Sequence, residues 1–221
     1  MIKRIALTVT ILAALAAAVP AFAGITVYSN AFKSRSDYHA ITKQAGKKKK
    51  CKRNWRKKSA LGVTVKGGKQ VCQLKTPVEG DSPQPDLIVQ VEAKLTEATQ
   101  KAARKGAFVG VTVRSSRKDG YTFRVIPKTR KWELVEDKVV LEKGKDKAVK
   151  GIKKKNMLEI RAKGDTIVGK VNGKTMTSYK DPSPDDVKGT GTGLAYGIKQ
   201  KVKKKDAVAF FDKLKVQVPN P

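Results

Sequence analysis

NMLEIRAKGDTIVGKVNGKTMTSY, residues 156–179, is the stretch that decides the fold of this chain. It holds three short runs of alternating apolar and polar residues, joined by the turn sequences Gly164-Asp165 and Asn172-Gly173. Alternation with a period of two is typical of half-buried strands, and Gly-Asp and Asn-Gly pairs are typical of tight hairpin turns. The stretch therefore predicts an antiparallel meander of three strands.

Further runs of the same kind lie on both sides of the meander. They occupy residues 61–65, 69–75, 87–95, 107–115, 121–127, 131–137, 138–143, 189–199 and 207–218. The segment 96–106 favours a helix but is short, so we expect it to decorate a loop between two strands. About twelve strands with short connections and no sustained helical period predict an all-β sandwich, and this pattern leaves open whether its topology is that of a jelly roll.

The first 23 residues have the layout of a secretory signal peptide. Lys3 and Arg4 precede an apolar run, and Ala21-Phe22-Ala23 forms a small-x-small cleavage site. The alternative, an uncleaved membrane anchor, requires about 20 apolar residues, which the run does not reach. We expect cleavage after Ala23, which leaves a secreted, extracytoplasmic protein without a membrane span, a monomer divided into a basic N-terminal arm at 24–59 and a sandwich at 60–221.

The charge balance is strongly basic. The chain has 49 Lys and Arg against 19 Asp and Glu, a formal net charge of +30, and Lys3 and Arg4 account for only two of these charges. Such a surplus outside the cell favours an anionic partner, for example an acidic polysaccharide of the envelope, a teichoic acid, anionic lipid or extracellular DNA. The alternative is a solvated basic surface without a ligand.

Three clusters concentrate the basic residues and are the candidate anion-binding sites. They are Lys47, Lys48, Lys49, Lys50, Lys52, Arg53, Arg56, Lys57 and Lys58; Lys153, Lys154 and Lys155; and Lys203, Lys204 and Lys205. Trp55 lies inside the first cluster and is a candidate for stacking on a sugar or a base. The alternative is that Trp55 packs on the sandwich beside the disulfide. We expect at least two of these clusters to share one rim of the sandwich.

The chain has two cysteines, Cys51 and Cys72. In an exported protein a pair of cysteines at this spacing is typical of one disulfide that closes a loop of about 20 residues. A catalytic or metal-binding cysteine would need partners, and His39 is the single histidine of the chain. The sequence therefore predicts a structural disulfide.

The order of these runs resembles the concanavalin A-like lectin/glucanase jelly roll, in particular secreted bacterial laminin G-like or 3-keto-disaccharide hydrolase-type domains. The resemblance covers about residues 86–218, roughly two thirds of the chain after the signal peptide. It is carried by Asn156, Leu158, Ile160 and Arg161 at the start of one strand, Val171-Asn172-Gly173, the Gly-rich run 189–197 and Phe211-Asp212-Lys213-Leu214. The resemblance implies an all-β, antiparallel two-sheet jelly-roll sandwich, a fold whose members include lectins, glycosidases, adhesion modules and proteins of no known activity.

Catalytic signatures are missing from the sequence. The glucanase branch carries Glu-x-Asp-x-Glu along one strand, but Glu92 and Glu159 stand alone, and Glu133 and Glu136 are three positions apart and face opposite sides. There is no Gly-x-Ser-x-Gly elbow, and too few His and Cys exist for a zinc site. GKVNGKT at 169–175 resembles a phosphate loop but leads into a strand. We assign no catalytic residue.

A cofactor is not indicated, with calcium as the one open question. Lectin-like sandwiches often hold calcium with loop carboxylates. Asp181, Asp185 and Asp186 cluster in one loop, and Asp81 and Asp86 in another. Asp-Pro and Ser-Pro pairs also initiate turns, and no spacing here matches a dedicated calcium loop, so we assign no metal ligand.

These observations lead to one main hypothesis and two alternatives. The main hypothesis is a secreted, non-catalytic module that binds carbohydrate or another, anionic, envelope or extracellular polymer. The alternatives are a glycoside-active enzyme of the 3-keto-disaccharide hydrolase type and a structural surface protein. Paired carboxylates in a groove would favour the enzyme, and a groove without them would favour binding.

Overall fold

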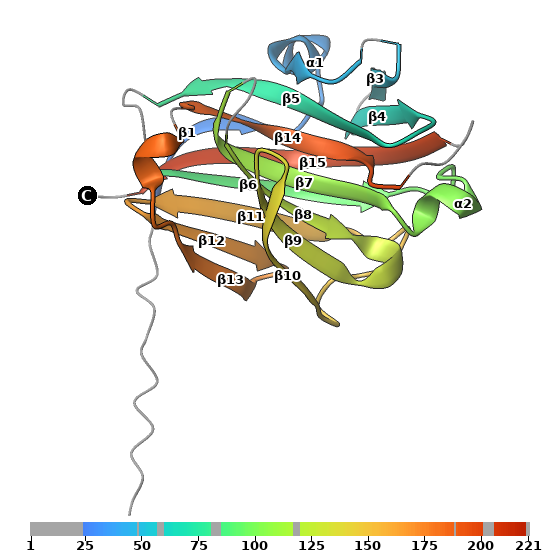
Figure 1. Ribbon diagram of the computed structural model, residues 1–221. Helices are drawn as coiled ribbons and strands as arrows, with labels where there is room; N and C mark the ends of the chain where they lie inside the picture. The colour runs from blue at the N-terminus through green and yellow to red at the C-terminus, as the bar shows by residue number, and fades with distance from the viewer. Residues whose placement is uncertain are drawn as a thin grey trace, which may run out of the picture.

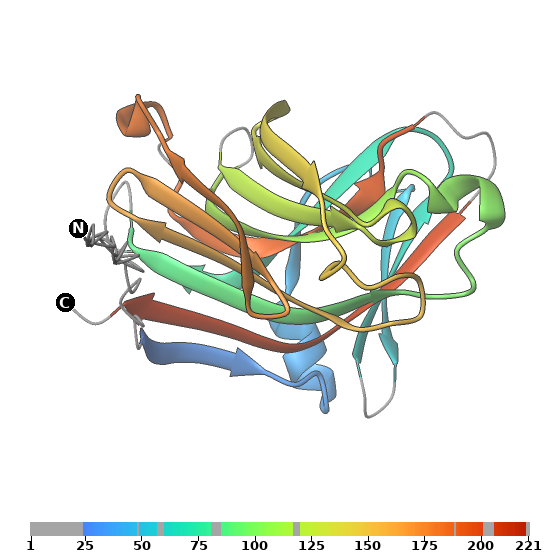
Figure 2. The same ribbon diagram turned by 90° about the horizontal axis from the view of Figure 1, so that it is seen from below.

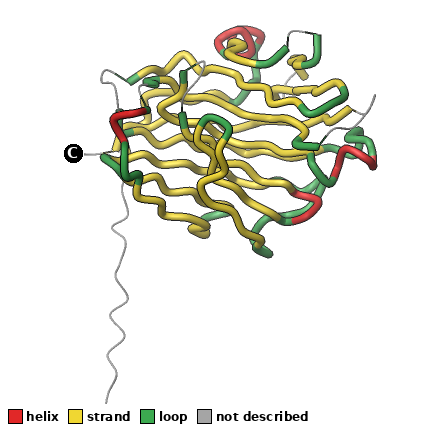
Figure 3. The backbone as a smooth tube through the Cα atoms, in the orientation of Figure 1, coloured by secondary structure: helices red, strands yellow, loops and turns green. Residues whose placement is uncertain are grey.

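The computed structural model describes residues 24–47, 49–56, 60–80, 85–116, 120–187, 189–200 and 206–219. The signal peptide expected at residues 1–23 lies outside this range. Strands make up most of the described backbone, and the helices are short and peripheral (Figure 3). The helices are α1 (Arg35–Ala40), α2 (Lys101–Arg104), η1 (Pro127–Thr129) and η2 (Pro184–Asp186).

Two antiparallel sheets pack face to face (Figures 1 and 2). Sheet A has the order β13 (Lys174–Lys180), β12 (Thr166–Val171), β11 (Asn156–Lys163), β6 (Leu87–Leu95), β15 (Asp206–Pro219), β4 (Ala60–Lys66) and β3 (Cys51–Arg56), with β1 (Gly24–Asn30) also paired to β15. Sheet B has the order β10 (Val139–Lys145), β9 (Lys131–Glu136), β8 (Tyr121–Ile126), β7 (Ala107–Ser115), β14 (Gly191–Ile198), β5 (Gln70–Glu79) and β2 (Thr42–Ala45). The predicted jelly-roll sandwich is confirmed.

The three-stranded meander predicted from residues 156–179 is β11, β12 and β13. Its first turn places Gly164 at φ 53°, and its second places Asn172 at φ 51° and Gly173 at φ 84°. Two consecutive positive φ angles are what a type I′ turn requires, and Asn-Gly adopts them with the least strain. Leu158, Ile160 and Ala162, on one face of β11, are fully buried between the sheets. Local turn chemistry and burial therefore agree on one register.

The segment expected to form an arm contributes strands to both sheets. β1 pairs with β15, β2 with β5, and β3 with β4. α1 begins with a capping box in which Ser34 and Asp37 each accept a backbone N–H. Residues 24–56 are thus hydrogen-bonded to the sandwich through three separate strands, because their short, polar runs pair along sheet edges.

β5 extends further than its alternating run predicts. The alternating run ends at Lys75, yet the strand reaches Glu79 and includes Pro77. The register with β14 jumps between Lys75 and Glu79, so Pro77 has no partner in the ladder. An irregular position of this kind tolerates a residue without a backbone N–H.

The predicted disulfide is confirmed. Cys51 at the start of β3 bonds to Cys72 in β5, with Cα atoms 5.8 Å apart and a sequence separation of 21. The bond therefore joins sheet A to sheet B at one side of the sandwich. Gly46 is adjacent, and a Cβ there would lie 2.5 Å from the Cys51 sulfur, so this corner admits only glycine without rearrangement.

Replacing both cysteines with serine is expected to lower the free energy of unfolding by about 3 kcal/mol, because the unfolded chain regains the conformational freedom of the closed loop. Urea unfolding of the oxidised protein and of the variant measures the difference. Reduced wild-type protein is the control and should unfold at the same urea concentration as the variant. Equal midpoints for the oxidised protein and the variant would contradict the prediction.

Candidate functional site

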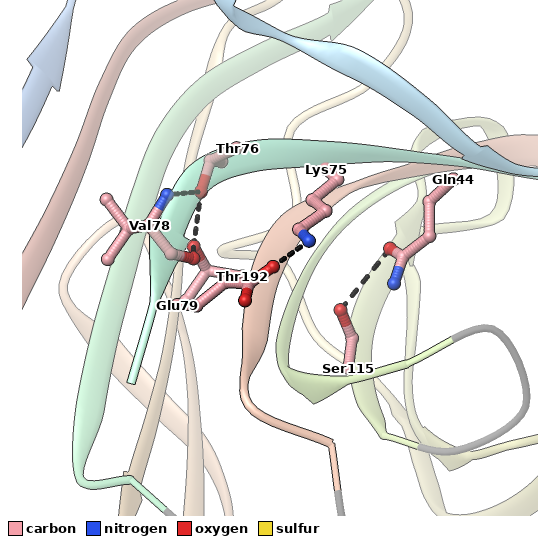
Figure 4. A network of polar contacts seen from close by, with 7 residues as sticks. All are labelled: Gln44, Lys75, Thr76, Val78, Glu79, Ser115 and Thr192. Atoms are coloured by element: carbon pink, nitrogen blue, oxygen red, sulfur yellow. Dashed lines mark hydrogen bonds and ion pairs between the residues drawn. The ribbon is translucent and has the colours of Figure 1, made fainter. Parts of the chain in front are cut away.

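The outer face of sheet B is strongly curved. In a flat sheet, β2 and β7 would lie about 14 Å apart, because β5 and β14 separate them. Instead, the hydroxyl of Ser115 on β7 donates a hydrogen bond of 3.4 Å to the side-chain carbonyl oxygen of Gln44 on β2 (Figure 4). The edge of the sheet therefore curls over its middle, which makes the face concave.

Small residues lie beneath the middle of this concave face. The paired strands β7 and β14 present Gly110, Gly193, Ala195 and Gly197 toward it. The positions beyond them carry larger side chains: Gly110 pairs with Arg124 on β8, and Ala195 pairs with Gln73 on β5. The Phe108 ring covers Gly197, and Arg124 covers Gly110, where added Cβ atoms would come within 2.6 Å and 2.9 Å of them, so the small residues make room for larger side chains, and a groove lies among these.

This groove has a volume of about 620 Å³. Aliphatic side chains stand on opposite walls, with Val71 of β5 43% exposed and Val140 of β10 37% exposed. The described lining residues are Ala45, Gly46, Lys69, Gln70, Val71, Gln73, Gly120, Thr122, Arg124, Val135, Asp137, Lys138, Val140, Ile198 and Lys199. Figure 1 looks onto this face, with the β9–β10 hairpin in front of it. Polar groups on the floor and aliphatic walls are the usual composition of a small-ligand site.

One buried carboxylate organises the cations at the groove floor. Glu133 on β9 accepts from Arg124 Nε at 2.8 Å, and its other oxygen is paired with Lys199. The Arg124 guanidinium also lies 4.7 Å from the centre of the Phe108 ring. Two cations thus share one carboxylate, which leaves the cluster with a net positive charge next to the groove.

The environment of Glu133 also decides its protonation. Burial alone would raise the pKa of the carboxyl, but hydrogen bonds and charge from Lys199 and Arg124 outweigh burial and hold the pKa below its usual range. Glu133 is therefore ionised and cannot act as a general acid at neutral pH. Among the described residues that line the groove, Asp137 is the only carboxylate. The paired carboxylates of a glycosidase are not found in this described lining.

The predicted anion-binding residues fall partly inside the described range. Lys47, Lys49 and Lys50 lie in the β2–β3 loop, Lys52 and Arg53 on β3, and Lys153, Lys154 and Lys155 directly before β11. Lys48, Lys57, Lys58, Lys203, Lys204 and Lys205 lie outside it, as does the side chain of Arg56. The first two clusters reach the same end of the sandwich, with β4, β15 and β6 between their strands in sheet A.

Several of these cations already have partners in the fold. The Arg53 guanidinium lies 4.7 Å from the Tyr38 ring and donates to the Tyr38 carbonyl, so it fastens α1 to β3. Lys153 is paired with Glu97 and Lys155 with Glu92. Neither cluster lies among the groove-lining residues. An anion-binding role for these lysines stays a prediction.

Trp55 and the acidic loops show no site of their own. Trp55 on β3 pairs with Leu61, is partly buried, and its indole N–H has no acceptor among the described residues. Asp181 accepts from the Tyr121 hydroxyl and from the Ser183 amide at 2.9 Å. No group of three or more His, Cys, Asp or Glu is placed to hold a metal ion in the described part of the chain, and Asp81 lies outside it.

The sequence did not predict the groove residues, because the predicted binding sites were clusters of consecutive basic residues, whereas the groove cations are spread over several strands and loops. The signal was nevertheless present: the alternation in 121–127 places Thr122 and Arg124 on the face opposite to Phe123. Pairing the hairpin of 121–126 with 131–136 sets Arg124 directly opposite Glu133. An arginine directly opposite a glutamate on the neighbouring strand was the signal in the sequence.

Fold and site together define a concanavalin A-like jelly roll with a groove on its concave sheet. No family model matches the chain, and no curated protein matches it. Among solved structures, it resembles a protein of unknown function with a galectin-like fold from Bacillus subtilis, with a TM-score of 0.62, 11% identity, and coverage of 89% of this chain and 98% of that one.

Two further similar structures are glycan-related by their names. The carbohydrate-binding module CBM66 from Bacillus subtilis matches with a TM-score of 0.56 and 15% identity over 80% of this chain and 95% of that one. The alginate lyase A1-II′, of polysaccharide lyase family 7, matches with a TM-score of 0.50 and 12% identity over 74% of this chain and 81% of that one. At these identities the likeness establishes the concanavalin A-like fold. No helix in the described residues is long and apolar enough to cross a membrane.

Proposed function

We propose that this protein is an exported, non-catalytic module that binds a polysaccharide in the groove of sheet B. The observation that carries the proposal is the groove itself, about 620 Å³ on a concave jelly-roll face with aliphatic walls and a polar floor. The C–H faces of a sugar ring pack on aliphatic side chains such as Val71 and Val140, and its hydroxyls hydrogen-bond to side chains such as Gln70 and Gln73. The glycan-related names of the similar structures support this reading.

The charge of the groove favours an acidic glycan. Arg124, Lys199, Lys69 and Lys138 line it, against Asp137 as the one described lining carboxylate. Because Arg124 is held by Glu133 and stacked on Phe108, its guanidinium is preorganised before a ligand arrives. A carboxylate on a sugar would find a fixed cation with little loss of side-chain entropy. Arg124 and Lys199 are therefore the assigned anchors for the anionic group, in a protein that acts as a monomer outside the cytoplasm.

The test compares Val71→Asp with Val218→Asp. Both valines are exposed to a similar degree, 43% and 40%, and both lie on strands, but only Val71 lines the groove. Val71→Asp places a charged, solvated group against the bound sugar and is expected to weaken glycan binding by about tenfold or more, which corresponds to about 1.4 kcal/mol. Val218→Asp changes the net charge equally and is expected to leave affinity within about twofold.

The measurement is a glycan array on residues 24–221 at about 0.1 M salt and at about 1 M salt, followed by titration of the strongest ligand with both variants. Binding to a defined glycan that Val71→Asp weakens and Val218→Asp spares is the expected result. Equal affinity in both variants would place the ligand outside the groove. No binding to any glycan at either salt concentration would overturn the proposed function.

A further inference from the structure

The loops at the two ends of the sandwich differ sharply in charge. One end, here called the basic end, holds the loops β2–β3, β4–β5, β6–β7, β8–β9, β10–β11, β12–β13 and β14–β15; its described residues include 15 Lys and Arg against two acids, Glu97 and Asp146. The described residues of the loops β5–β6, β7–β8, β9–β10, β11–β12 and β13–β14, at the opposite end, include one lysine and six aspartates. The positive charge of the described loops is therefore concentrated at one end of the sandwich.

Both acids of the basic end are already occupied. Glu97 pairs with Lys153, and Asp146 pairs with Lys174 at 2.7 Å. Twelve described cations of this end have no ion pair with a described residue: Lys47, Lys49, Lys50, Lys69, Lys101, Arg104, Lys105, Lys128, Arg130, Lys147, Lys150 and Lys154. Several of these cations come together at one hollow.

A pocket of about 290 Å³ lies within the basic end. Three loops build it: the β6–β7 loop that contains α2, the β8–β9 connection that contains η1, and the β10–β11 loop. Its lining residues are Glu97, Arg104, Pro127, Lys128, Arg130, Gly151, Ile152 and Lys153. Four cations thus surround a concave space in which the one carboxylate is already neutralised by Lys153. It shares no lining residue with the groove of sheet B.

The backbone holds this pocket in shape. The Arg104 side chain donates from Nε to the Thr99 carbonyl at 2.7 Å and from Nη2 to the Glu97 carbonyl at 3.0 Å. On the opposite wall, the fully buried Asn156 accepts from the Lys150 amide and donates to the Lys150 carbonyl, which ties the β10–β11 loop to the sheet. The Lys153 amide donates to the Leu95 carbonyl at 2.9 Å. A cationic pocket whose walls are tied down in this way loses little entropy when an anion enters.

We propose that this pocket is a second binding site, independent of the groove, for an oxyanion carried by a sugar, either the carboxylate of a uronate or a sulfate ester. An anion binds more favourably to cations that have no ion pair of their own, and Lys128 and Arg130 of the β8–β9 connection and Arg104 of the β6–β7 loop supply that charge. The volume suits a single charged sugar unit rather than a longer segment of chain. Ile152 and Pro127 supply apolar surface for the C–H groups of the ring.

The experiment is an amide NMR titration of residues 24–221 with methyl glucuronide, with methyl glucoside as the ligand that lacks the carboxylate, and with inorganic sulfate. Ionic strength is held at about 0.15 M with sodium chloride, so that general screening is constant. Saturable shifts at Gly151, Ile152 and Lys153 with the glucuronide or sulfate, but not with the glucoside, are expected. The stronger of the two anions identifies carboxylate or sulfate as the preferred group.

A matched pair of double variants separates the pocket from the general field of the basic end. Lys128→Gln/Arg130→Gln removes two charges from the pocket, and Lys101→Gln/Lys105→Gln removes two exposed charges from the same end that do not line it. The pocket variant is expected to weaken anion binding by about tenfold or more and the control by less than about twofold. Equal weakening by both variants, or shifts that do not saturate with any anion, would overturn the proposal. If glycans did not bind in the groove, the shifts at Gly151, Ile152 and Lys153 would still be expected, so each proposal can be contradicted without the other.

Discussion

Replacing Glu133 with leucine is expected to lower the free energy of unfolding by about 3 to 5 kcal/mol, the usual cost of leaving a buried charge without its partner. The Glu133 side chain is 5% exposed and that of its partner Arg124 is 9% exposed, so the guanidinium cannot turn to water when the carboxylate is lost. Lys199, at 33%, can partly do so. The orphaned Arg124 should account for most of the cost. Urea unfolding monitored by the tryptophan fluorescence of the protein measures it.

The control for this prediction is the double variant Arg124→Met/Glu133→Leu. Both charges are then replaced by apolar groups of similar size, so no buried charge is left without a partner. The free energy of unfolding is therefore expected to return to within about 1 to 2 kcal/mol of the wild-type value. A double variant as unstable as Glu133→Leu would show that packing, not charge, dominates the site. The double variant should still lose affinity for acidic glycans, because the assigned anchor is gone.

The same pair predicts a pH dependence. The pKa of Glu133 is lowered in the folded protein, so its contribution to stability is present above the unfolded pKa and is lost as the pH falls through the folded pKa. The stability difference between the wild type and Glu133→Leu should therefore be constant near neutral pH and shrink below about pH 4. A difference that stays constant to pH 2 would contradict this account.

Replacing Phe123 with alanine is expected to cost about 3 to 5 kcal/mol of unfolding free energy. The ring is fully buried between the sheets and lies directly on Gly169 of β12, where a Cβ would come within 2.4 Å of it. It also neighbours the Trp132 ring, with centroids 6.3 Å apart. Phe123 therefore fills space that Gly169 leaves in the facing sheet, and its removal opens a cavity there.

The complementary size swap tests this contact. Gly169→Val alone is expected to destabilise by about 1 to 3 kcal/mol, because the new side chain overlaps the ring. In Phe123→Ala/Gly169→Val the new side chain occupies part of the cavity, so the double variant should be more stable than the sum of the two single variants by at least about 1 kcal/mol. Simple additivity in urea unfolding would show that the two residues do not share one space.

The alternation of apolar and polar residues and the residues typical of tight turns made most of the strands predictable. The run 87–95 became β6 and the run 107–115 became β7 with the expected bounds, because each alternates over nine residues toward a fully buried face. The turn Asn172-Gly173 lies where the sequence placed it. Such features depend on neighbours within a few positions of the chain, which is the range over which pattern is informative.

The edges were harder to predict. β1, β2 and β3 come from a polar stretch without clear alternation, since an edge strand needs one hydrogen-bonded neighbour and little burial. Their partners β15, β5 and β4 are set by the closure of the sandwich. No local pattern in residues 24–56 carries that information.

Composition and spacing alone predicted the all-β class, the disulfide between Cys51 and Cys72 and the excess of positive charge, and the resemblance to a known family added the jelly-roll architecture. Tertiary structure alone decided where that charge lies: it curled sheet B into a groove, set Arg124 against Glu133 in its floor, and brought Arg104 from the β6–β7 loop and Lys128 and Arg130 from the β8–β9 connection around one pocket. The reason is physical. Burial and turn geometry are local and repeat along the chain, whereas the field at a site sums charges from distant segments and depends on how the sheets curve.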